Sequence, residues 1–352
     1  MARLSDYTDD LIAFKRQRSV SRAVVALGRD GSLSGSQRIV REQFGGDPQA
    51  LDIIAKGAVV PASTSSVTQF NQTNISTLVS LLGPQDSASA AIFARAIGIN
   101  LDDSYGVMVP TITATGSGVS FVAQGAPIPV KQFAFSGPTL TPQKLALVVG
   151  FTRELFNSSN ADSLVRVLLA ENLALGLDTI LLDAVAGDTT RPAGLRNGVA
   201  ATTATAGGGL AAMTADLAAL AAAVAPIGGS ELLFVASPKQ YFKINLLRTA
   251  PLPFPLIASS GLGDGIVVCI ATNALAVAGG NDPPRIQVST EALLHFEDTS
   301  PLAIGTVGTP PTVAAPTRSL FQTDGVAVRL TADITWALRA TGAISWTQSV
   351  TW

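Results

Sequence analysis

The chain has 352 residues, enough for one large domain or two ordinary ones. Only 14% of the residues are charged and the net charge is −2, values that are low for a soluble monomer and consistent with a surface covered by other subunits. No segment supplies the ~20 consecutive apolar residues of a transmembrane helix, and the polar, acidic start MARLSDYTDD is not a signal peptide. The one cysteine, Cys269, cannot form an internal disulfide and suggests a reducing compartment.

Residues 1 to about 56 are expected to form a distinct segment, followed by an extended linker rich in serine and threonine at residues 57–74. Between Lys15 and Arg41 the charged residues are basic except for Asp30. Such a run either lines a solvated face or contacts phosphate or the acidic side chains of a neighbouring subunit. The candidates for such a contact are Lys15, Arg16, Arg18 and Arg22.

A long two-stranded excursion is predicted downstream of residue 105. A strand at Tyr105–Thr113 leads into a hairpin whose middle is interrupted by Gly125, Pro127 and Pro129, and Leu140–Phe156 returns as a strand. Because an isolated hairpin is marginal in water, this excursion needs a surface to lie on. The apolar residues that it would present are Val119, Phe121, Ile128, Phe133 and Phe135.

The longest helix signal covers Ser159–Val185. A capping oxygen from Ser159 or Asn160 begins it, Gly187 supplies a stop, and about 27 residues would make a rod of roughly 40 Å. The predicted buried stripe is Leu164, Leu168, Leu175 and Leu182, and it is widened by Val167, Leu173, Ile180 and Leu181.

The rest of the chain follows an α/β pattern. A helix is predicted at about Thr214–Ala225, then a buried strand at Glu231–Ser237, a helix at Pro238–Arg248 and a second strand at Gly265–Thr272. Further strands are expected at residues 285–290 and 292–296. A final β region alternates through Val326, Val328, Leu330, Ala332 and Ile334.

The sequence offers few groups for catalysis. Its single histidine, His295, lies in the strand-like stretch LLHFED, where a structural role is more frequent than a general base. With one histidine and one cysteine, the common thiolate–imidazole metal clusters are excluded. Neither a G-x-S-x-G motif nor a G-x-x-x-x-G-K-[ST] loop occurs. We therefore expect no enzymatic activity, no cofactor and no metal.

The order of these elements resembles the HK97-fold major capsid proteins of tailed bacteriophages, over residues 75–352. Five segments in the correct order carry the resemblance. They are FVAQGAPIPVKQFAF, LTPQKLALVVGFTRELFNSS, the long helix with LALGLDTILL, RPAGLRNGV, and LFQTDGVAVRLTADITWAL with its late Trp336.

The resemblance implies an α+β, HK97-like capsid fold with an N-terminal arm at residues 1–74. The first part of a peripheral domain would occupy 75–198, including an extended loop at 116–137 and a spine helix at 159–185. An axial α/β domain would occupy 199–312, and the strands of 313–352 would complete the peripheral domain. The loop would reach across a neighbouring subunit, with Val119, Phe121, Ile128, Lys131, Phe133 and Phe135 as contact candidates.

Self-association is the function that the resemblance implies. Pentamers and hexamers would build an icosahedral shell around double-stranded DNA, bound without sequence specificity. Portal, scaffolding and decoration proteins are further partners of the family, and no membrane is expected. The protein would be assembled in the host cytoplasm and reside in the virion.

Two departures from the family pattern accompany these expectations. Family loops often carry a glutamate where this chain has Gln124, and Lys131 lacks an evident asparagine and glutamate partner set for cross-linking. Two alternatives stay open: an encapsulin-like compartment holding an enzyme cargo, and an α/β enzyme that remains monomeric.

Overall fold

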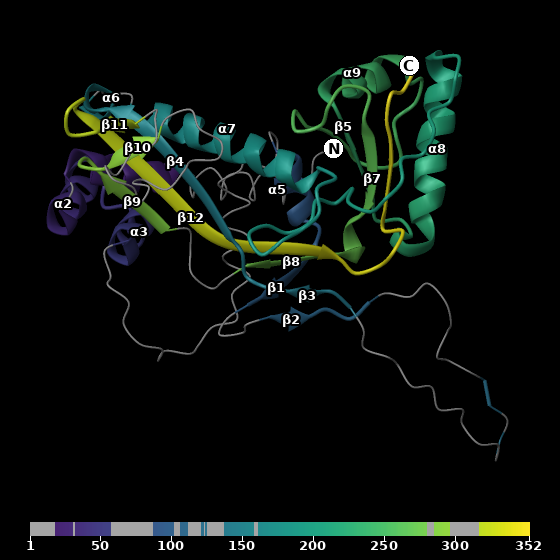
Figure 1. Ribbon diagram of the computed structural model, residues 1–352, viewed down its shortest axis with the longest axis horizontal. Coiled ribbons are helices and arrows are strands. Elements are labelled where there is room, and N and C mark those ends of the chain that lie inside the picture. Colours follow the sequence, from purple (N-terminus) through teal and green to yellow (C-terminus); the bar gives the residue numbers. More distant parts are fainter. Residues whose placement is uncertain are drawn as a thin grey trace, which may run out of the picture. The chain divides into compact units, whose positions relative to one another are not determined.

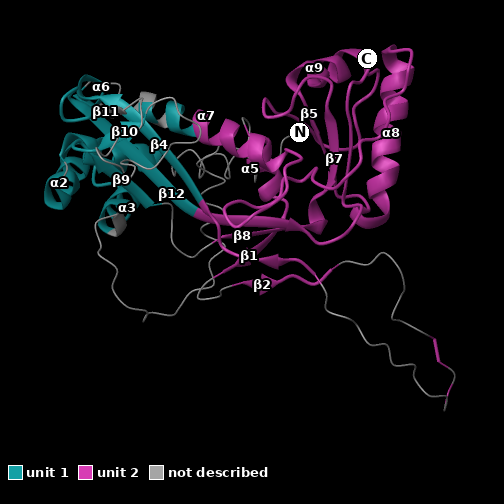
Figure 2. Ribbon diagram, viewed as in Figure 1, with its two compact units in different colours: residues 1–69, 145–170, 282–332 teal, residues 70–144, 171–281, 333–352 magenta. Residues whose placement is uncertain are grey.

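The computed structural model describes residues 18–30, 32–57, 87–101, 106–111, 121–122, 124, 137–157, 161–279, 285–295 and 317–352. The chain forms two compact units (Figures 1 and 2). Unit 1 comprises residues 1–69, 145–170 and 282–332, and unit 2 comprises residues 70–144, 171–281 and 333–352. These divisions differ from the four segments expected from the sequence, so the arm, peripheral and axial assignments stay predictions.

Unit 1 contains a group of helices at residues 18–29, α2 (Leu33–Gln43) and α3 (Pro48–Gly57). The Ser32 side chain caps α2 by accepting a hydrogen bond from the backbone N–H of Gly35. From residue 18 onward, the basic segment is therefore a packed helical structure. Its small core consists of Ala23, Ala26, Val40, Ala50 and Ile54.

The strands of unit 1 begin with β4 (Lys144–Thr152), which is followed by the short helix α6 (Arg153–Asn157). The antiparallel pair β10 (Leu293–His295) and β11 (Thr317–Ser319) forms a separate two-stranded sheet. Two of the predicted strands are confirmed here, since β9 occupies Arg285–Ser289 and β10 lies within 292–296.

Strand β12 (Gly325–Leu338) contributes residues to both units. In unit 1, residues 327–331 pair antiparallel with β9, and in unit 2, residues 334–338 pair antiparallel with β8 (Leu275–Gly279). Strand β8 also pairs in parallel with β1 (Ile97–Asn100). The predicted alternation of β12 is confirmed in part: Val326, Val328, Leu330 and Ile334 are buried, but Ala332 is half-buried, and Ala327 and Thr335 of the opposite set are buried too.

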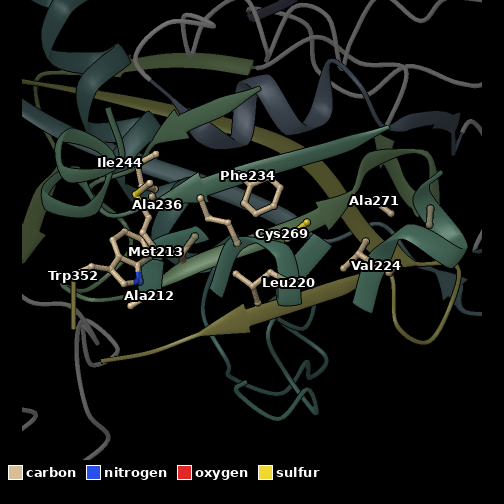
Figure 3. Close-up of a cluster of buried hydrophobic side chains, with 14 of the residues drawn as sticks. Ala212, Met213, Leu220, Val224, Phe234, Ala236, Ile244, Cys269, Ala271 and Trp352 are labelled. Carbon is tan, nitrogen blue, oxygen red and sulfur yellow. The ribbon is translucent and has the colours of Figure 1, made fainter. Parts of the chain in front are cut away.

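A four-stranded sheet forms the centre of unit 2, in the order β13 (Ile344–Thr347), β7 (Val267–Ala271), β5 (Leu232–Ala236), β6 (Leu256–Ala258). Strand β5 is antiparallel to β7 and parallel to β6. Helices α8 (Gly209–Gly228) and α9 (Pro238–Leu247) pack on alternate residues of β5 and β7 (Figure 3). That core includes Met213, Leu220, Val224, Phe234, Ile244 and Cys269.

Helix α8 (Gly209–Gly228) is longer than the sequence predicts and keeps Pro226 in its last turn. It starts from Gly207, Gly208 and Gly209, which all have positive φ, a conformation that glycine adopts at little cost. The three consecutive glycines therefore form the turn that leads into the N-terminus of α8. A short connection leads from β5 to α9 (Pro238–Leu247), which has its proline in the first turn, as the sequence predicts. The remaining elements of unit 2 include α5 (Ala88–Phe93) and the 3₁₀ turn η1 (Thr272–Ala274).

The long helix α7 spans Ala161–Leu181, within the predicted range, but its buried side matches the predicted stripe only in part. The prediction is confirmed at Leu182, Leu173 and Leu181, which are buried. It is wrong at Val167, Leu168 and Leu175, which are 45%, 38% and 51% exposed, and the side chain of Leu164 lies outside the described residues. Apolar residues surround the helix, so hydrophobicity alone does not distinguish its faces. The buried positions recur at Val165, Leu169, Leu173, Leu177 and Leu181.

The segment RPAGLRNGV caps the end of α7. Arg191 forms an ion pair with Asp183 at 2.8 Å, and Arg196 donates from Nε to the carbonyl oxygen of Leu182. A Cβ at Gly194 would lie 1.9 Å from Oδ1 of Asp183, so only glycine fits there. Two guanidinium groups thus satisfy acceptors at the negative end of the helix dipole.

A buried carboxylate connects three segments of unit 2. Asp178 on α7 is 3% exposed. Its Oδ1 accepts hydrogen bonds from Ser87 Oγ (2.9 Å) and Ser89 N (2.8 Å), and its Oδ2 accepts from Ala88 N (3.0 Å) and Ser259 Oγ (2.7 Å). Sequence inspection suggests an arginine partner for Asp178, whereas the hydrogen-bond donors that the described residues supply to it are neutral. The arrangement holds the start of α5 and the loop after β6 onto α7.

We predict that Asp178→Ala destabilises the subunit by about 3 kcal/mol or more, because several buried donors lose their acceptor. Asp178→Asn should also destabilise it, since its amide turns a donor toward another donor. Urea unfolding of unassembled subunit measures both. Asp188→Ala is the control, because Asp188 accepts hydrogen bonds from Thr190 and Arg191 at the surface, and it should cost less. Equal losses for Asp178→Ala and Asp188→Ala would contradict the prediction.

We predict that Cys269 does not react with thiol reagents in the folded protein. Burial raises the pKa of the Cys269 thiol to about 12, so at pH 8 only roughly one molecule in ten thousand carries the thiolate. Labelling with a chromogenic disulfide should therefore be slow until denaturant is added, and then rapid. Fast labelling under native conditions would show that β7 opens readily.

Candidate assembly surface

The expected loop begins and ends on a short antiparallel ladder in unit 2. Strand β2 (Val107–Met108) pairs with β3 (Thr139–Leu140), and the N–H of Val109 donates to the carbonyl oxygen of Pro138 at 3.0 Å. A Cβ at Gly137 would lie 1.7 Å from the carbonyl oxygen of Val109, so the two backbones approach as closely as glycine allows. The ends of the expected loop are therefore held together by backbone contacts.

Phe121, within this loop, is fully exposed, at 107% of its reference area. Its neighbour Val122 is 37% exposed, and Gln124 is also exposed. Leaving a phenylalanine in water forgoes about 1.5–3 kcal/mol of burial energy. Phe121 therefore marks a surface suited to a partner. The other predicted loop contacts lie outside the described residues: Val119, Ile128, Lys131, Phe133 and Phe135.

The predicted basic contacts have different surroundings. Lys15 and Arg16 lie outside the described residues, and Arg18 is exposed at the start of its helix. Arg22 forms an ion pair with Asp47 at 3.0 Å. Burial acts to raise the pKa of Asp47, but hydrogen bonds from Ser19 and the Ala50 backbone, together with Arg22, lower it below its usual value. The charge of Arg22 is thus largely neutralised within its own subunit.

Several further apolar side chains are exposed that sequence reasoning did not single out. Phe242 and Leu246 on α9 are 64% and 82% exposed. The sequence of α9 could have predicted this exposure. Its apolar residues lie on more than one face of the helix, and only one face can be buried in the subunit; they are Tyr241, Phe242, Ile244, Leu246 and Leu247. In unit 1, Val148 and Phe321 are also exposed.

The groups that could perform chemistry are dispersed. Within the described part of the chain, no cluster of three histidine, cysteine or acidic residues is placed to hold a metal ion. His295 lies half-buried on β10, and neither of its ring nitrogens has a hydrogen-bond partner there. The buried Cys269 is held as the neutral thiol. The described surface instead exposes large apolar side chains that a partner could cover, such as Phe121, Phe242 and Leu246.

Comparisons with known proteins agree with this picture. Residues 83–251 match the Phage capsid family. No curated protein matches the chain. A structure from Mycobacterium phage Bobi is similar at 16% identity with a TM-score of 0.52, and one from Mycobacterium phage Cain at 14% identity with a TM-score of 0.50. Both similarities cover 75% of this chain and 90% of the other.

At these identities the two structures establish the fold, and the family match covers the segment from α5 to the end of α9. The α+β class and the resemblance predicted from the sequence are both confirmed. Over residues 83–251 the chain is therefore similar to the phage capsid family, and its fold is the α+β, HK97-like capsid fold.

Proposed function

We propose that this protein is a major capsid protein whose copies assemble into the pentamers and hexamers of an icosahedral shell enclosing double-stranded DNA. The match of residues 83–251 to the Phage capsid family and the fold support the proposal. The observation that carries it is Phe121, a fully exposed phenylalanine in a loop whose two ends are fixed by β2 and β3. Such a side chain contributes nothing to its own subunit and gains free energy only from another molecule.

The loop at residues 116–137 acts as a clamp on a neighbouring subunit. Burying one phenylalanine supplies about 2–3 kcal/mol, from which the cost of ordering the loop is subtracted. Each contact is therefore weak, but a closed shell repeats it at every subunit. Because the loop and the surface that receives it are different, the contact is heterologous and can close into rings.

The other segments take the roles that the family implies. Helix α7 (Ala161–Leu181), within the expected range 159–185, acts as the spine helix of the peripheral domain, and residues 199–312 form the axial domain, which meets its copies at the fivefold and sixfold centres. Support for the axial assignment comes from the sheet β13-β7-β5-β6, most of which falls in this range and which has a core of its own with α8 and α9.

The N-terminal arm, residues 1–74, contacts DNA or a neighbouring subunit through its positive charge. Since Arg22 is paired with Asp47, Lys15, Arg16 and Arg18 are left for that contact. Phosphate contacts of this kind carry no sequence specificity. The shell assembles in the host cytoplasm, joins portal, scaffolding or decoration proteins, and becomes part of the virion.

We predict that Phe121→Ser weakens shell formation and that replacing residues 121–135 by a short Gly-Ser turn abolishes it. The subunit should still fold, because the β2–β3 ladder and Gly137 lie outside the replaced segment. Circular dichroism reports the fold, and sedimentation with negative-stain microscopy reports closure. Gln124→Ser, an exposed polar position in the same loop, is the matched control and should leave shells unchanged. Normal shells from the shortened chain would refute the clamp.

We predict that particles isolated from the host contain nuclease-protected double-stranded DNA. The physical reason is that a closed shell excludes nucleases from anything packaged inside it. Nuclease treatment followed by extraction and gel electrophoresis tests this. A co-purifying enzyme without nucleic acid would point instead to an encapsulin-like compartment. A protein that stays monomeric at every concentration would contradict both the capsid and the encapsulin-like compartment.

A further inference from the structure

We propose that neighbouring copies within a ring are joined by α9 of one subunit packing on the outer face of α8 of the next. This inference rests on the proposed capsid function, and it identifies the residues of one contact. Both helices belong to unit 2, lie within the continuously described stretch 161–279, and touch one another on one side of the sheet (Figures 1 and 2).

The outer face of α8 is free of charge along its whole length. The one charged residue of the helix, Asp216, is on the buried side, where Oδ2 accepts a hydrogen bond from the Trp352 indole and Oδ1 accepts one from the N–H of Thr205. Even the hydroxyl of the exposed Thr214 is turned back to the carbonyl oxygens of the preceding turn. The other exposed positions of this face are Leu210, which is 39% exposed, and Ala211, Ala215, Ala218, Ala219, Ala222, Ala223, Ala225 and Pro226.

Such a face is suited to being covered. The solvent side of a helix in a monomer normally carries charged and polar residues, and this one carries methyl groups. Alanine has no side-chain rotamers to lose on burial, so covering it costs little conformational entropy. Its small side chains also allow another element to approach the helix backbone closely. The result is a smooth apolar surface of about five helical turns.

Helix α9 presents the opposite shape. Phe242 and Leu246 are four residues apart, so they project from the same side of the helix, 64% and 82% exposed. One turn earlier, Lys239 is paired with Asp264 at 3.6 Å, which places its charge toward its own subunit. Two large apolar side chains therefore protrude from this face of α9, and the charge of Lys239 beside them already has a partner.

The outer face of α8 and the exposed face of α9 are complementary in shape, and both belong to unit 2. Protruding side chains on α9 fit a flat alanine surface better than they fit each other. A contact between two different patches of the same protein is heterologous, and repetition of it generates a ring rather than a dimer. A second copy of this chain is therefore the occupant that the geometry favours.

A membrane is the other surface that such a helix could contact, since α8 is long and apolar enough to cross a bilayer by length and composition. Its inner side, however, is packed in the core of unit 2 and holds Asp216 against Trp352. Its outer side lacks the tryptophan, tyrosine, lysine and arginine residues that anchor helices at a bilayer surface. These features favour a protein partner.

The test introduces charges on each surface of the full chain. Ala222→Glu and Leu246→Lys are both at exposed positions, so circular dichroism should show a folded subunit. Each alone should raise the concentration needed for shell assembly at least about tenfold, equivalent to roughly 1.4 kcal/mol per contact. The double variant should recover assembly, because the lysine of one copy meets the glutamate of the next. Gln49→Glu, an exposed position on α3, is the control and should change nothing.

Cysteine pairing tests the same geometry directly. A chain carrying both Ala222→Cys and Leu246→Cys should give, under mild oxidation, a ladder of disulfide-linked oligomers that ends at five or six, whereas each single variant should give no ladder. The buried Cys269 does not interfere. Because one reactive cysteine per chain can link only two chains, a disulfide-linked dimer from either single variant would pair like surfaces and overturn the proposal, as would the absence of any ladder from the double variant.

The remaining outcomes separate this contact from the proposed function. If the wild-type protein and both charged variants form normal shells, the proposed α8–α9 contact is contradicted and the proposed capsid function is not. Wild-type protein that never assembles would overturn both. Binding of wild-type protein to vesicles of phosphatidylcholine and phosphatidylglycerol, lost in Ala222→Glu while shells still form, would assign the face to a membrane and overturn the proposal.

Discussion

The carboxylate of Asp178 is the constraint on which the arrangement of unit 2 depends. A buried carboxylate is tolerated only when its oxygens are saturated by donors, since burial removes it from water. Asp178 takes its donors from the start of α5 and from Ser259, and so fixes both segments against the second half of α7. Because Ser87 and Ser89 lie at the first turn of α5, the same contact sets where that helix begins.

The end of α7 is fixed by a related device. Arg191 and Arg196 bring donors to acceptors that the last turn of the helix would otherwise leave to water, and Arg196 also lies 4.7 Å from the ring of Trp346 on β13. The guanidinium of Arg196 thus connects the helix end to the central sheet of unit 2. The buried polar groups in the last turns of α7 are therefore satisfied by hydrogen bonds from other segments of unit 2.

The surface shows the opposite tendency, because large apolar side chains and a charge-free helix face are left in water. Phe121, Phe242 and Leu246 add nothing to the stability of their own subunit while they are exposed. In a protein with so few charged residues, this distribution shifts free energy from folding to association. A capsid subunit benefits from that distribution, since it must stay soluble long enough to fold and then associate many times over through weak, repeated contacts.

Local patterns in the sequence determined much of the fold. The alternation of Val326, Val328 and Leu330 predicts one buried face of β12, and Pro238 marks the start of α9, because both signals depend on neighbouring residues alone. The fold family followed from the order of five motifs, and Phe121 was a predicted contact from its place in one of them.

Only the tertiary structure decided which side of α7 is buried, since leucine and valine occur all round that helix. It also decided the partners of Asp178, of which Ser87 is 91 residues away and Ser259 is 81 residues away. Likewise, the sequence shows α8 as a run of alanines. Strands from distant parts of the sequence bury one side of α8 and leave the other side exposed. A local sequence pattern does not report such long-range contacts.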